Sequence, residues 1–490
     1  MAPKLNLPEL LCKGAYINGQ WITDAKSKFQ VQDPATLEVI GELPDQGPDD
    51  IDIAIESASA AFTTFKKTTP RERSKYLRDI YNLMIENVDD LAKIITWENG
   101  KHINEAIGEI KYAASYFEWY AEEAPRIYGT TIQPTNPTNR VFTMRQPVGV
   151  CGIITPWNFP SAMITRKAAA AIAAGCPVII KPDHQTPYSA LALAYFFDKL
   201  NLPKGIFNIV LSKSHVPEIG LKMCESTKIK KISFTGSTNI GKILMKQSAS
   251  TLKKLSFELG GNAPIVVFDD ADINLAISQS IASKFRGLGQ TCVCANRLYI
   301  QQGIYDKFVE KFSKEVSKFK VGNGFDTSCT HGCLINQLAI DKVKDHIKDA
   351  LSKGAVVKIK GGRDDSLGPN FYNPTVLSNC TQDMKVAKEE TFGPLAAIFK
   401  FSDIEDVIHW SNDVEHGLAS YVFSKDINNI YIMAENLEYG MISCNTGIFT
   451  DSSIPFGGVK ESGFGREGSL HGIDDYTILK AVTIGNIPQI

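Results

Sequence analysis

The chain of 490 residues is long enough for two or three domains, each with its own core. Its composition, with 43% hydrophobic and 22% charged residues and a formal net charge of −2, is typical of a globular protein. That balance excludes a surface that holds nucleic acid or a membrane mainly by charge. The longest apolar run, residues 168–180, is interrupted by Gly175 and Pro177 and is too short to cross a bilayer.

Cysteines, histidines and the N-terminal segment indicate the protein's environment. Ten cysteines are scattered along the chain without a C-x-x-C pair, as is typical of reduced intracellular thiols. The eight histidines show no metal-ligand spacing, so no metal site is expected. Residues 1–20 carry neither a long apolar core nor an Arg-rich amphipathic pattern, and we therefore expect no targeting peptide and a cytoplasmic protein.

The first 146 residues predict a β-hairpin, long helices and a strand. Residues 14–39 are typical of hairpins, because an Asn-Gly turn stands between apolar residues. Thr69 and Pro70 form a helix start, with Thr69 as the N-cap. The alternating residues 140–146 predict an exposed strand.

Two α/β alternations follow. In the first, strands are expected at residues 147–154, 178–182, 206–211 and 230–234, with helical patterns between them. This alternation predicts a parallel α/β sheet of the dinucleotide-binding type. The second alternation begins at Gly260 and runs to about Ile454, and the tail from Tyr476 to Gly485 predicts a further strand.

A cysteine on a glycine-bearing turn is the leading candidate nucleophile. Gly287 and Gly289 precede Cys292 and allow the backbone to approach another segment or a ligand closely. The thiolate of such a cysteine attacks carbonyl carbon. The alternative is that Cys292 is a small buried apolar residue.

A glycine turn suggests phosphate binding. Residues 236–242, Gly-Ser-Thr-Asn-Ile-Gly-Lys, follow a predicted strand and open a helix. They are one residue short of a P-loop, and Ile243 stands where a hydroxyl would bind Mg²⁺, which disfavours a nucleoside triphosphatase. The turn still offers N–H groups and a positive dipole end to a phosphate, with an ordinary strand–helix connection as the alternative.

Three further polar residues stand where chemistry is expected. Lys181 ends a buried strand, where α/β sheets bind ligands. Glu258 lies among apolar residues and glycines, where burial makes a carboxylate a usable general base. Asn158 lies in a Pro-bracketed turn, from which its amide could donate to an oxyanion. The respective alternatives are a solvated strand end, an exposed helix end and a turn asparagine bonded to its own backbone.

The order of these motifs resembles the NAD(P)⁺-dependent aldehyde dehydrogenase superfamily. The matching segments are Pro156-Trp157-Asn158-Phe159-Pro160, Lys181-Pro182, Phe234-Thr235-Gly236-Ser237, Glu258-Leu259-Gly260-Gly261, Gly289-Gln290-Thr291-Cys292, Glu390-Thr391-Phe392-Gly393-Pro394 and Pro455-Phe456-Gly457-Gly458. The resemblance implies an α/β fold with a Rossmann-type cofactor domain, an α/β catalytic domain and a small β oligomerisation arm. A binding protein on this scaffold would have lost the nucleophile or the base, and both are present.

The resemblance also implies roles for single residues. Cys292 would be the nucleophile, Glu258 the general base and Asn158 the oxyanion donor, together with the backbone N–H of Cys292. Ser237 would hold the cofactor pyrophosphate. The residues expected around the cofactor are Thr155, Pro156, Trp157, Lys181, His184, Gly236, Ser237, Glu390 and Phe392.

Within the superfamily the chain is most similar to the branch that oxidises succinate semialdehyde in the GABA shunt, which has the same Gly-Gln-Thr-Cys-Val-Cys. That branch binds the substrate carboxylate with two arginines and a hydroxyl, and the matching positions are Arg166, Arg286 and Thr450. An arginine pair is the expected way to select an ω-carboxylate aldehyde over a neutral one. Glutarate semialdehyde is the alternative substrate, since one methylene is worth only about 1–3 kcal/mol.

The choice between NADP⁺ and NAD⁺ is expected to depend on His184. By resemblance, Lys181 and Glu390 would hold the cofactor riboses. NAD-specific relatives often have a glutamate where this chain has His184, and that charge repels a 2′-phosphate. We therefore predict that NADP⁺ is accepted, with a preference for it left open, and that Ser212 or Lys213 adds contacts.

The resemblance suggests a redox lock, a domain division and an assembly. Cys294 would form a strained, easily reduced disulfide with Cys292, with a spectator thiol as the alternative. Family members form homodimers or homotetramers through a protruding strand pair, and their partner is a small aldehyde rather than nucleic acid or a membrane. The predicted limits are 1–127 and 149–259 for the cofactor domain, 260–455 for the catalytic domain, and 128–148 and 470–490 for the arm.

Overall fold

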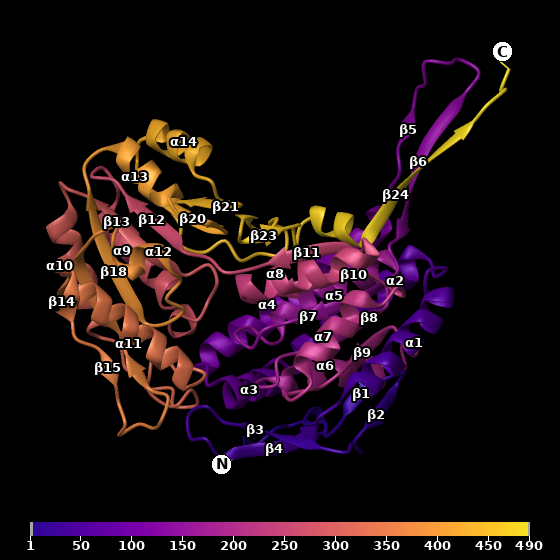
Figure 1. Ribbon diagram of the computed structural model, residues 1–490, viewed down its shortest axis with the longest axis horizontal. Coiled ribbons are helices and arrows are strands. Elements are labelled where there is room, and N and C mark those ends of the chain that lie inside the picture. Colours follow the sequence, from indigo (N-terminus) through magenta and orange to yellow (C-terminus); the bar gives the residue numbers. More distant parts are fainter. Residues whose placement is uncertain (1–2, 489–490) are drawn as a thin grey trace.

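The structure is a computed structural model that describes residues 3–488. Figure 1 shows two lobes side by side, each built around a sheet, and a ribbon of strands that projects from one of them. The second lobe holds the elements from β12 to β21, and the first holds most of the remaining chain.

Eight strands form the first sheet, in the order β2-β1-β9-β8-β7-β10-β11-β23. The five central strands are parallel, and the edge strands β1, β2 and β23 are antiparallel to their neighbours. The expected dinucleotide-binding sheet is therefore present. Its strands are β1 (Ala15–Ile17), β2 (Gln20–Ile22), β7 (Val150–Ile154), β8 (Val178–Lys181), β9 (Phe207–Ile209), β10 (Ile229–Thr235), β11 (Lys254–Glu258) and β23 (Gly463–Phe464).

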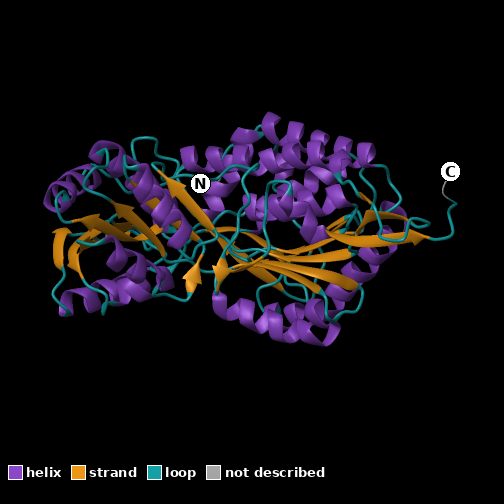
Figure 2. Ribbon diagram, turned by 90° about the horizontal axis from the view of Figure 1, so that it is seen from above, coloured by secondary structure: helices purple, strands orange, loops and turns teal. Residues whose placement is uncertain are grey.

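Helices cover both faces of this sheet, as Figure 2 shows. Successive side chains of a strand point to opposite faces, so Val178 and Ile180 pack under α2–α6 while Ile179 faces α1, α7 and α8. Burial on both faces explains why these strands are apolar throughout. The helices are α1 (Pro48–Phe65), α2 (Pro70–Glu86), α3 (Val88–Asn99), α4 (Ile103–Glu123), α5 (Ala162–Ala174), α6 (Pro187–Lys199), α7 (Val216–Glu225) and α8 (Thr238–Ser248).

The second sheet has seven strands in the order β14-β17-β18-β13-β12-β20-β21, and all pairs except β14–β17 are parallel. Its strands are β12 (Ala263–Val267), β13 (Ala295–Gln301), β14 (Val356–Ile359), β17 (Thr375–Cys380), β18 (Leu395–Phe401), β20 (Ala419–Phe423) and β21 (Met441–Cys444). Its helices are α9 (Ile273–Lys284), α10 (Tyr305–Val316), α11 (Gln337–Ser352), α12 (Lys385–Lys388), α13 (Ile404–Asn412) and α14 (Ile427–Asn436).

The projecting ribbon consists of β24 (Thr477–Ile484), β6 (Arg140–Pro147) and β5 (Thr131–Ile132). β24 pairs antiparallel with the whole of β6, which confirms both predicted strands. Ile478 and Leu479 on this ribbon are 49% and 59% exposed. Its role in assembly stays a prediction.

The start of α2 follows from a local signal in the sequence. Thr69 caps α2 by accepting from the backbone N–H of Glu72, whose carboxylate in turn accepts from Thr69, so the predicted helix start is confirmed.

The domain limits stay a prediction, and β23 shows that the chain returns to the first sheet after residue 455. Smaller pairs are β3 (Lys28–Gln32) with β4 (Val39–Pro44), β15 (Gly362–Arg363) with β16 (Tyr372–Asn373), and β19 (His416–Gly417) with β22 (Val459–Lys460).

Candidate active site

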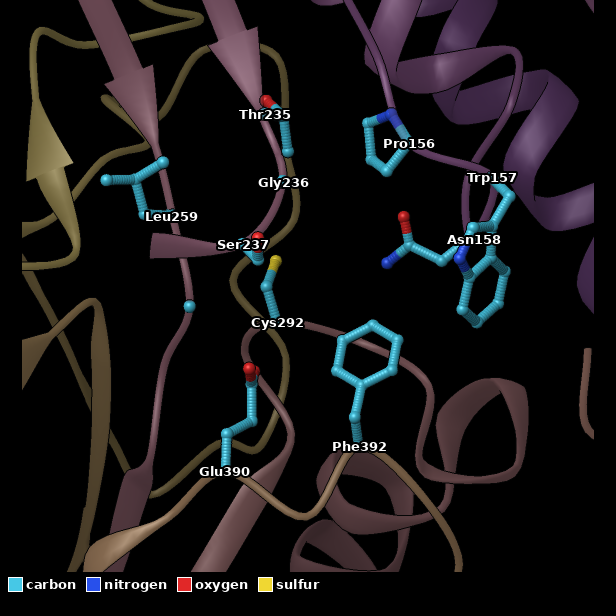
Figure 3. Close-up of a pocket in the computed structure, with 11 residues that line it drawn as sticks. Pro156, Trp157, Asn158, Thr235, Gly236, Ser237, Leu259, Cys292, Glu390 and Phe392 are labelled. Carbon is cyan, nitrogen blue, oxygen red and sulfur yellow. The ribbon is translucent and has the colours of Figure 1, made fainter. Parts of the chain in front are cut away.

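A cavity of about 220 Å³ lies where the carboxyl ends of β7, β10 and β11 meet loops of the second lobe. Open α/β sheets bind ligands at this edge. Figure 3 shows the side chains that surround it. They are Pro156, Trp157, Asn158, Thr235, Gly236, Ser237, Leu259, Gly260, Cys292, Glu390 and Phe392.

The predicted nucleophile and the predicted base are in direct contact. Cys292 Sγ donates to Glu258 Oε1 at 3.0 Å, and both side chains are buried. Burial, followed by the adjacent Glu258 charge, raises the pKa of the Cys292 thiol well above its usual value. The resting thiol is therefore protonated, and Glu258 is the group placed to take its proton.

The turn before Cys292 depends on its glycines. Gly287, Leu288 and Gly289 all have positive φ angles, of 57°, 55° and 82°. A Cβ on Gly289 would lie 2.2 Å from the carbonyl oxygen of Gly393. The close backbone approach expected at this turn is present, and it packs the cysteine loop against the loop before β18.

Asn158 extends toward Cys292 from the loop after β7 (Figure 3). Its Nδ2 donates to the Gln290 carbonyl at 3.1 Å, and its Oδ1 accepts from the Phe159 N–H at 3.1 Å. These bonds fix which end of the amide carries the N–H groups. The second N–H of Nδ2 remains for an oxyanion in a buried setting, where such a donor is most effective.

A buried ion pair behind Asn158 was missed by the sequence analysis. Lys101 Nζ lies 2.5 Å from Glu109 Oε2 and donates to the Asn158 carbonyl at 2.8 Å. Glu109 Oε1 accepts from the Ser161 N–H at 3.0 Å. The pair thus fixes the backbone at Asn158 and in the residues that follow it. No local pattern marks it, because it forms only when α4 packs on this loop.

We expect Lys101→Met to lower kcat about tenfold or more with little change in the aldehyde KM, because it displaces Asn158 without touching the substrate. Glu109 would remain buried and unpaired, which should cost about 3–5 kcal/mol of unfolding free energy. The double variant Lys101→Met/Glu109→Gln should regain stability but not kcat. Steady-state kinetics and denaturant unfolding measure both quantities, and wild-type kcat in the double variant would contradict the positioning role.

The structure brings together two of the three predicted carboxylate ligands. Arg286 Nη1 donates to Thr450 Oγ1 at 3.2 Å. Arg166 is paired with two carboxylates instead: its Nη2 lies 2.5 Å from Glu258 Oε2 and its Nε 2.7 Å from Glu467 Oε2. A guanidinium that is only 2% exposed needs such paired charges. Nothing local in the sequence connects Arg166 with Glu467, which lies 301 residues away.

Six of the predicted cofactor residues line the cavity beside Cys292, namely Pro156, Trp157, Gly236, Ser237, Glu390 and Phe392. Thr155 is buried at the end of β7, and its Oγ1 has no hydrogen-bond partner within residues 3–488. Ser237 caps α8, whose N-terminal N–H groups face the same region. A free buried hydroxyl beside a helix N-terminus and apolar walls fits a ligand that carries hydroxyls and phosphates.

Lys181 and His184 lie outside that cavity. Lys181 Nζ donates to the neighbouring backbone carbonyl at 2.9 Å, and burial lowers its pKa. His184 lines a second cavity together with Lys213. Burial is the largest cause of the lowered pKa of His184. The carboxylate of Asp183, 3.4 Å away, and that of Asp45 oppose the lowering, while the charges of Lys181 and Lys213 add to it. Ser212 is buried and donates to Asp45, and its contact with the cofactor stays a prediction.

Glu390, the predicted ribose ligand, lines the cavity beside Cys292. It accepts from the Gly261 N–H at 3.2 Å, and burial raises its pKa to about 7. An ionised carboxylate accepts from ribose hydroxyls more strongly than a protonated one. We therefore expect the cofactor KM to rise as pH falls below about 7, and to stay flat there in Glu390→Gln. Parallel KM–pH curves for the two proteins would contradict this role.

All ten cysteines are free thiols, Cys294 included. Cys294 Sγ is directed at the Arg286 carbonyl, 3.9 Å away, and the disulfide with Cys292 stays a prediction. In the described part of the chain, no group of His, Cys, Asp and Glu side chains could hold a metal ion. No helix between residues 3 and 488 is both long and apolar enough to span a bilayer.

Comparisons with known proteins decide the family. The family profile described as "Aldehyde dehydrogenase family" matches residues 21–482. The chain belongs to the aldehyde dehydrogenase family. This aldehyde dehydrogenase is 63% identical over 487 residues to the NADP(+) succinate-semialdehyde dehydrogenase of Saccharomyces cerevisiae, which covers 99% of the chain and 98% of that protein.

Two further relatives extend the comparison. A glutarate-semialdehyde dehydrogenase of Pseudomonas aeruginosa is 49% identical over 480 residues, covering 98% of this chain and 99% of its own. A crystal structure described as an Escherichia coli NADP-dependent enzyme has a TM-score of 0.96 and 48% identity, and covers 98% of this chain and 100% of that one. The aldehyde dehydrogenase fold is thereby confirmed, and a P-loop nucleoside triphosphatase is excluded.

Proposed function

We propose that this aldehyde dehydrogenase oxidises succinate semialdehyde to succinate with NADP⁺. The observation that carries the proposal is the buried Cys292–Glu258 pair with two arginines beside it. Arg166 bonds Glu258 directly, and the Arg286 guanidinium lies 4.9 Å from the Phe159 ring centre, next to Asn158. Such cations suit an aldehyde that carries a carboxylate. The substrate printed for the yeast relative supports the same choice.

The chain's own residues account for both halves of the reaction. Cys292 sulfur attacks the aldehyde carbon while Glu258 takes the thiol proton. Asn158 Nδ2–H, with the Cys292 backbone N–H, stabilises the oxyanion of the adduct. Bound NADP⁺ supplies the two-electron oxidation of that adduct, which leaves a thioester on Cys292. After the thiol proton has passed from Glu258 to solvent, Glu258 takes a proton from water, and succinate is released as that proton is returned to Cys292 sulfur.

Two lysines near His184 favour NADP⁺. Lys181 and Lys213 act on His184 together with Asp183 and Asp45, and position 184 itself carries no carboxylate. The lysines suit a 2′-phosphate, whereas a glutamate at position 184 would repel it. We expect His184→Glu to raise the KM for NADP⁺ by about tenfold while changing that for NAD⁺ far less. Unchanged use of NADP⁺ by His184→Glu would count against this assignment.

Glutarate semialdehyde is the second candidate substrate, because the Pseudomonas aeruginosa relative is described as acting on it. One methylene is worth about 1–3 kcal/mol, so kcat/KM should favour the four-carbon substrate by about tenfold or more. Initial rates with both semialdehydes at saturating NADP⁺ test this. A higher kcat/KM for glutarate semialdehyde would make it the assigned substrate and succinate semialdehyde the second candidate.

Assembly and location complete the proposal. We propose a homodimer or homotetramer that forms through β6 and β24, because exposed apolar residues such as Leu479 lie on this ribbon. Sedimentation of wild-type protein and of a variant with charged residues at Ile478 and Leu479 would test it. We further propose a cytoplasmic location, which fractionation of the native protein would test.

A further inference from the structure

Arg166 is shared between two carboxylates. Its Nε bonds Glu467 at 2.7 Å and its Nη2 bonds Glu258 at 2.5 Å. The guanidinium carbon lies 4.1 Å from the centre of the Phe456 ring, and the residue is 2% exposed. Glu467 thus bonds the Nε atom, on the inner edge of the guanidinium, while Glu258, the general base, bonds Nη2 on its outer edge.

Only the carboxyl group of Glu258 separates Arg166 from the nucleophile. One of its oxygens lies 3.0 Å from Cys292 Sγ and the other 2.5 Å from Arg166 Nη2. In succinate semialdehyde, three carbon–carbon bonds join the aldehyde carbon to the carboxylate carbon. A substrate attached to Cys292 sulfur therefore brings a second carboxylate within reach of the same guanidinium. Arginine binds a carboxylate most strongly through two parallel hydrogen bonds, here from Nη1 and Nη2 of Arg166. Nη2 is the nitrogen that bonds Glu258.

The pairing with Arg166 is unfavourable for a general base. This bond keeps Glu258 on Cys292, whereas deacylation requires it to reach the hydrolytic water. An efficient second half-reaction therefore requires Glu258 to leave Arg166.

We propose that the substrate's own carboxylate releases the general base: in the acyl-enzyme it replaces Glu258 on the outer edge of Arg166. This inference rests on the proposed oxidation of succinate semialdehyde. Water oxygen then bonds to the thioester carbon while Glu258 takes one water proton. The carbon–sulfur bond breaks with its electron pair on sulfur, Glu258 returns its proton to Cys292, and the product acid loses its remaining proton to solvent. A neutral acyl group leaves the Arg166–Glu258 pair intact and should be hydrolysed slowly.

Propanal and formate together test the exchange, because they contain the two parts of succinate semialdehyde without the bond between them. Stopped-flow measurement of NADPH with wild-type protein and propanal should show a burst of about one equivalent per subunit and then a slow steady rate. Formate should raise the steady rate about tenfold and leave the burst rate unchanged. Formamide, a neutral molecule of the same shape, should not raise the steady rate, and neither should chloride at equal ionic strength.

A variant gives a second, independent readout. Arg166→Met frees Glu258 permanently, so its propanal reaction should lose the burst and its response to formate, while its KM for succinate semialdehyde rises. If this variant fails to fold, the wild-type formate experiment decides alone. The inference is overturned if propanal gives no burst, if formate does not accelerate the steady rate, or if formamide matches formate.

The same rates separate this inference from the proposed function. A large kcat/KM preference for succinate semialdehyde over propanal without a formate effect would leave the substrate assignment standing and remove the exchange. Equal kcat/KM values would remove the substrate assignment whatever formate does.

Discussion

Glu258→Gln should lower kcat by about two to four orders of magnitude while preserving a first turnover. A glutamine cannot take a proton from water, so the thioester on Cys292 should accumulate. The first half-reaction should slow, because Glu258 no longer takes the thiol proton, but it should persist, because loss of the Glu258 charge removes one cause of the raised pKa of the Cys292 thiol. Stopped-flow detection of NADPH, with mass spectrometry of the acylated protein, measures both effects.

The matched control is Glu310→Gln, which makes the same chemical change at an exposed position of α10. It should keep wild-type kcat. A Glu258→Gln enzyme that turns over at more than about a tenth of the wild-type rate would mean that another group activates the water.

Asn158→Ala should lower kcat about a hundredfold, because an oxyanion donor of this kind is worth roughly 3 kcal/mol. The aldehyde KM should change little, since the charge that Asn158 stabilises develops only in the transition state. The burst phase with succinate semialdehyde should slow together with kcat. Pre-steady-state and steady-state rates on the same preparation measure this.

Asn158→Asp separates donation from packing. It preserves the size of the side chain but removes both N–H donors, so it should lose at least as much activity as the alanine variant. Thermal unfolding of both variants serves as the control for folding. Wild-type kcat in Asn158→Asp would contradict the assigned oxyanion site.

The reactive centre could be predicted because its residues follow strand ends. In a parallel sheet the carboxyl ends of neighbouring strands share one edge, so Asn158 after β7, Ser237 after β10 and Glu258 in β11 had to lie close together. Cys292 could be added from its glycine turn. Local sequence patterns report on such positions because the backbone alone fixes them.

The charge network behind this centre could not be predicted. Glu467 reaches Arg166 only after the chain has returned to the first sheet through β23. Lys101 and Glu109 meet the Asn158 loop only through the packing of α4. These contacts join distant residues through side chains, and neither periodicity nor turn chemistry encodes such partners. The pairing of Arg166 with Glu258 is the main feature that required the structure.

The most direct test of the proposed function compares kcat/KM for succinate semialdehyde and for propanal, each with NADP⁺ and with NAD⁺, from the rate of nicotinamide reduction. We predict that kcat/KM for succinate semialdehyde with NADP⁺ exceeds that for propanal by at least about a hundredfold, the difference expected when arginine side chains bind the substrate carboxylate. Equal kcat/KM values for the two aldehydes would contradict the carboxylate site and with it the assignment of the substrate.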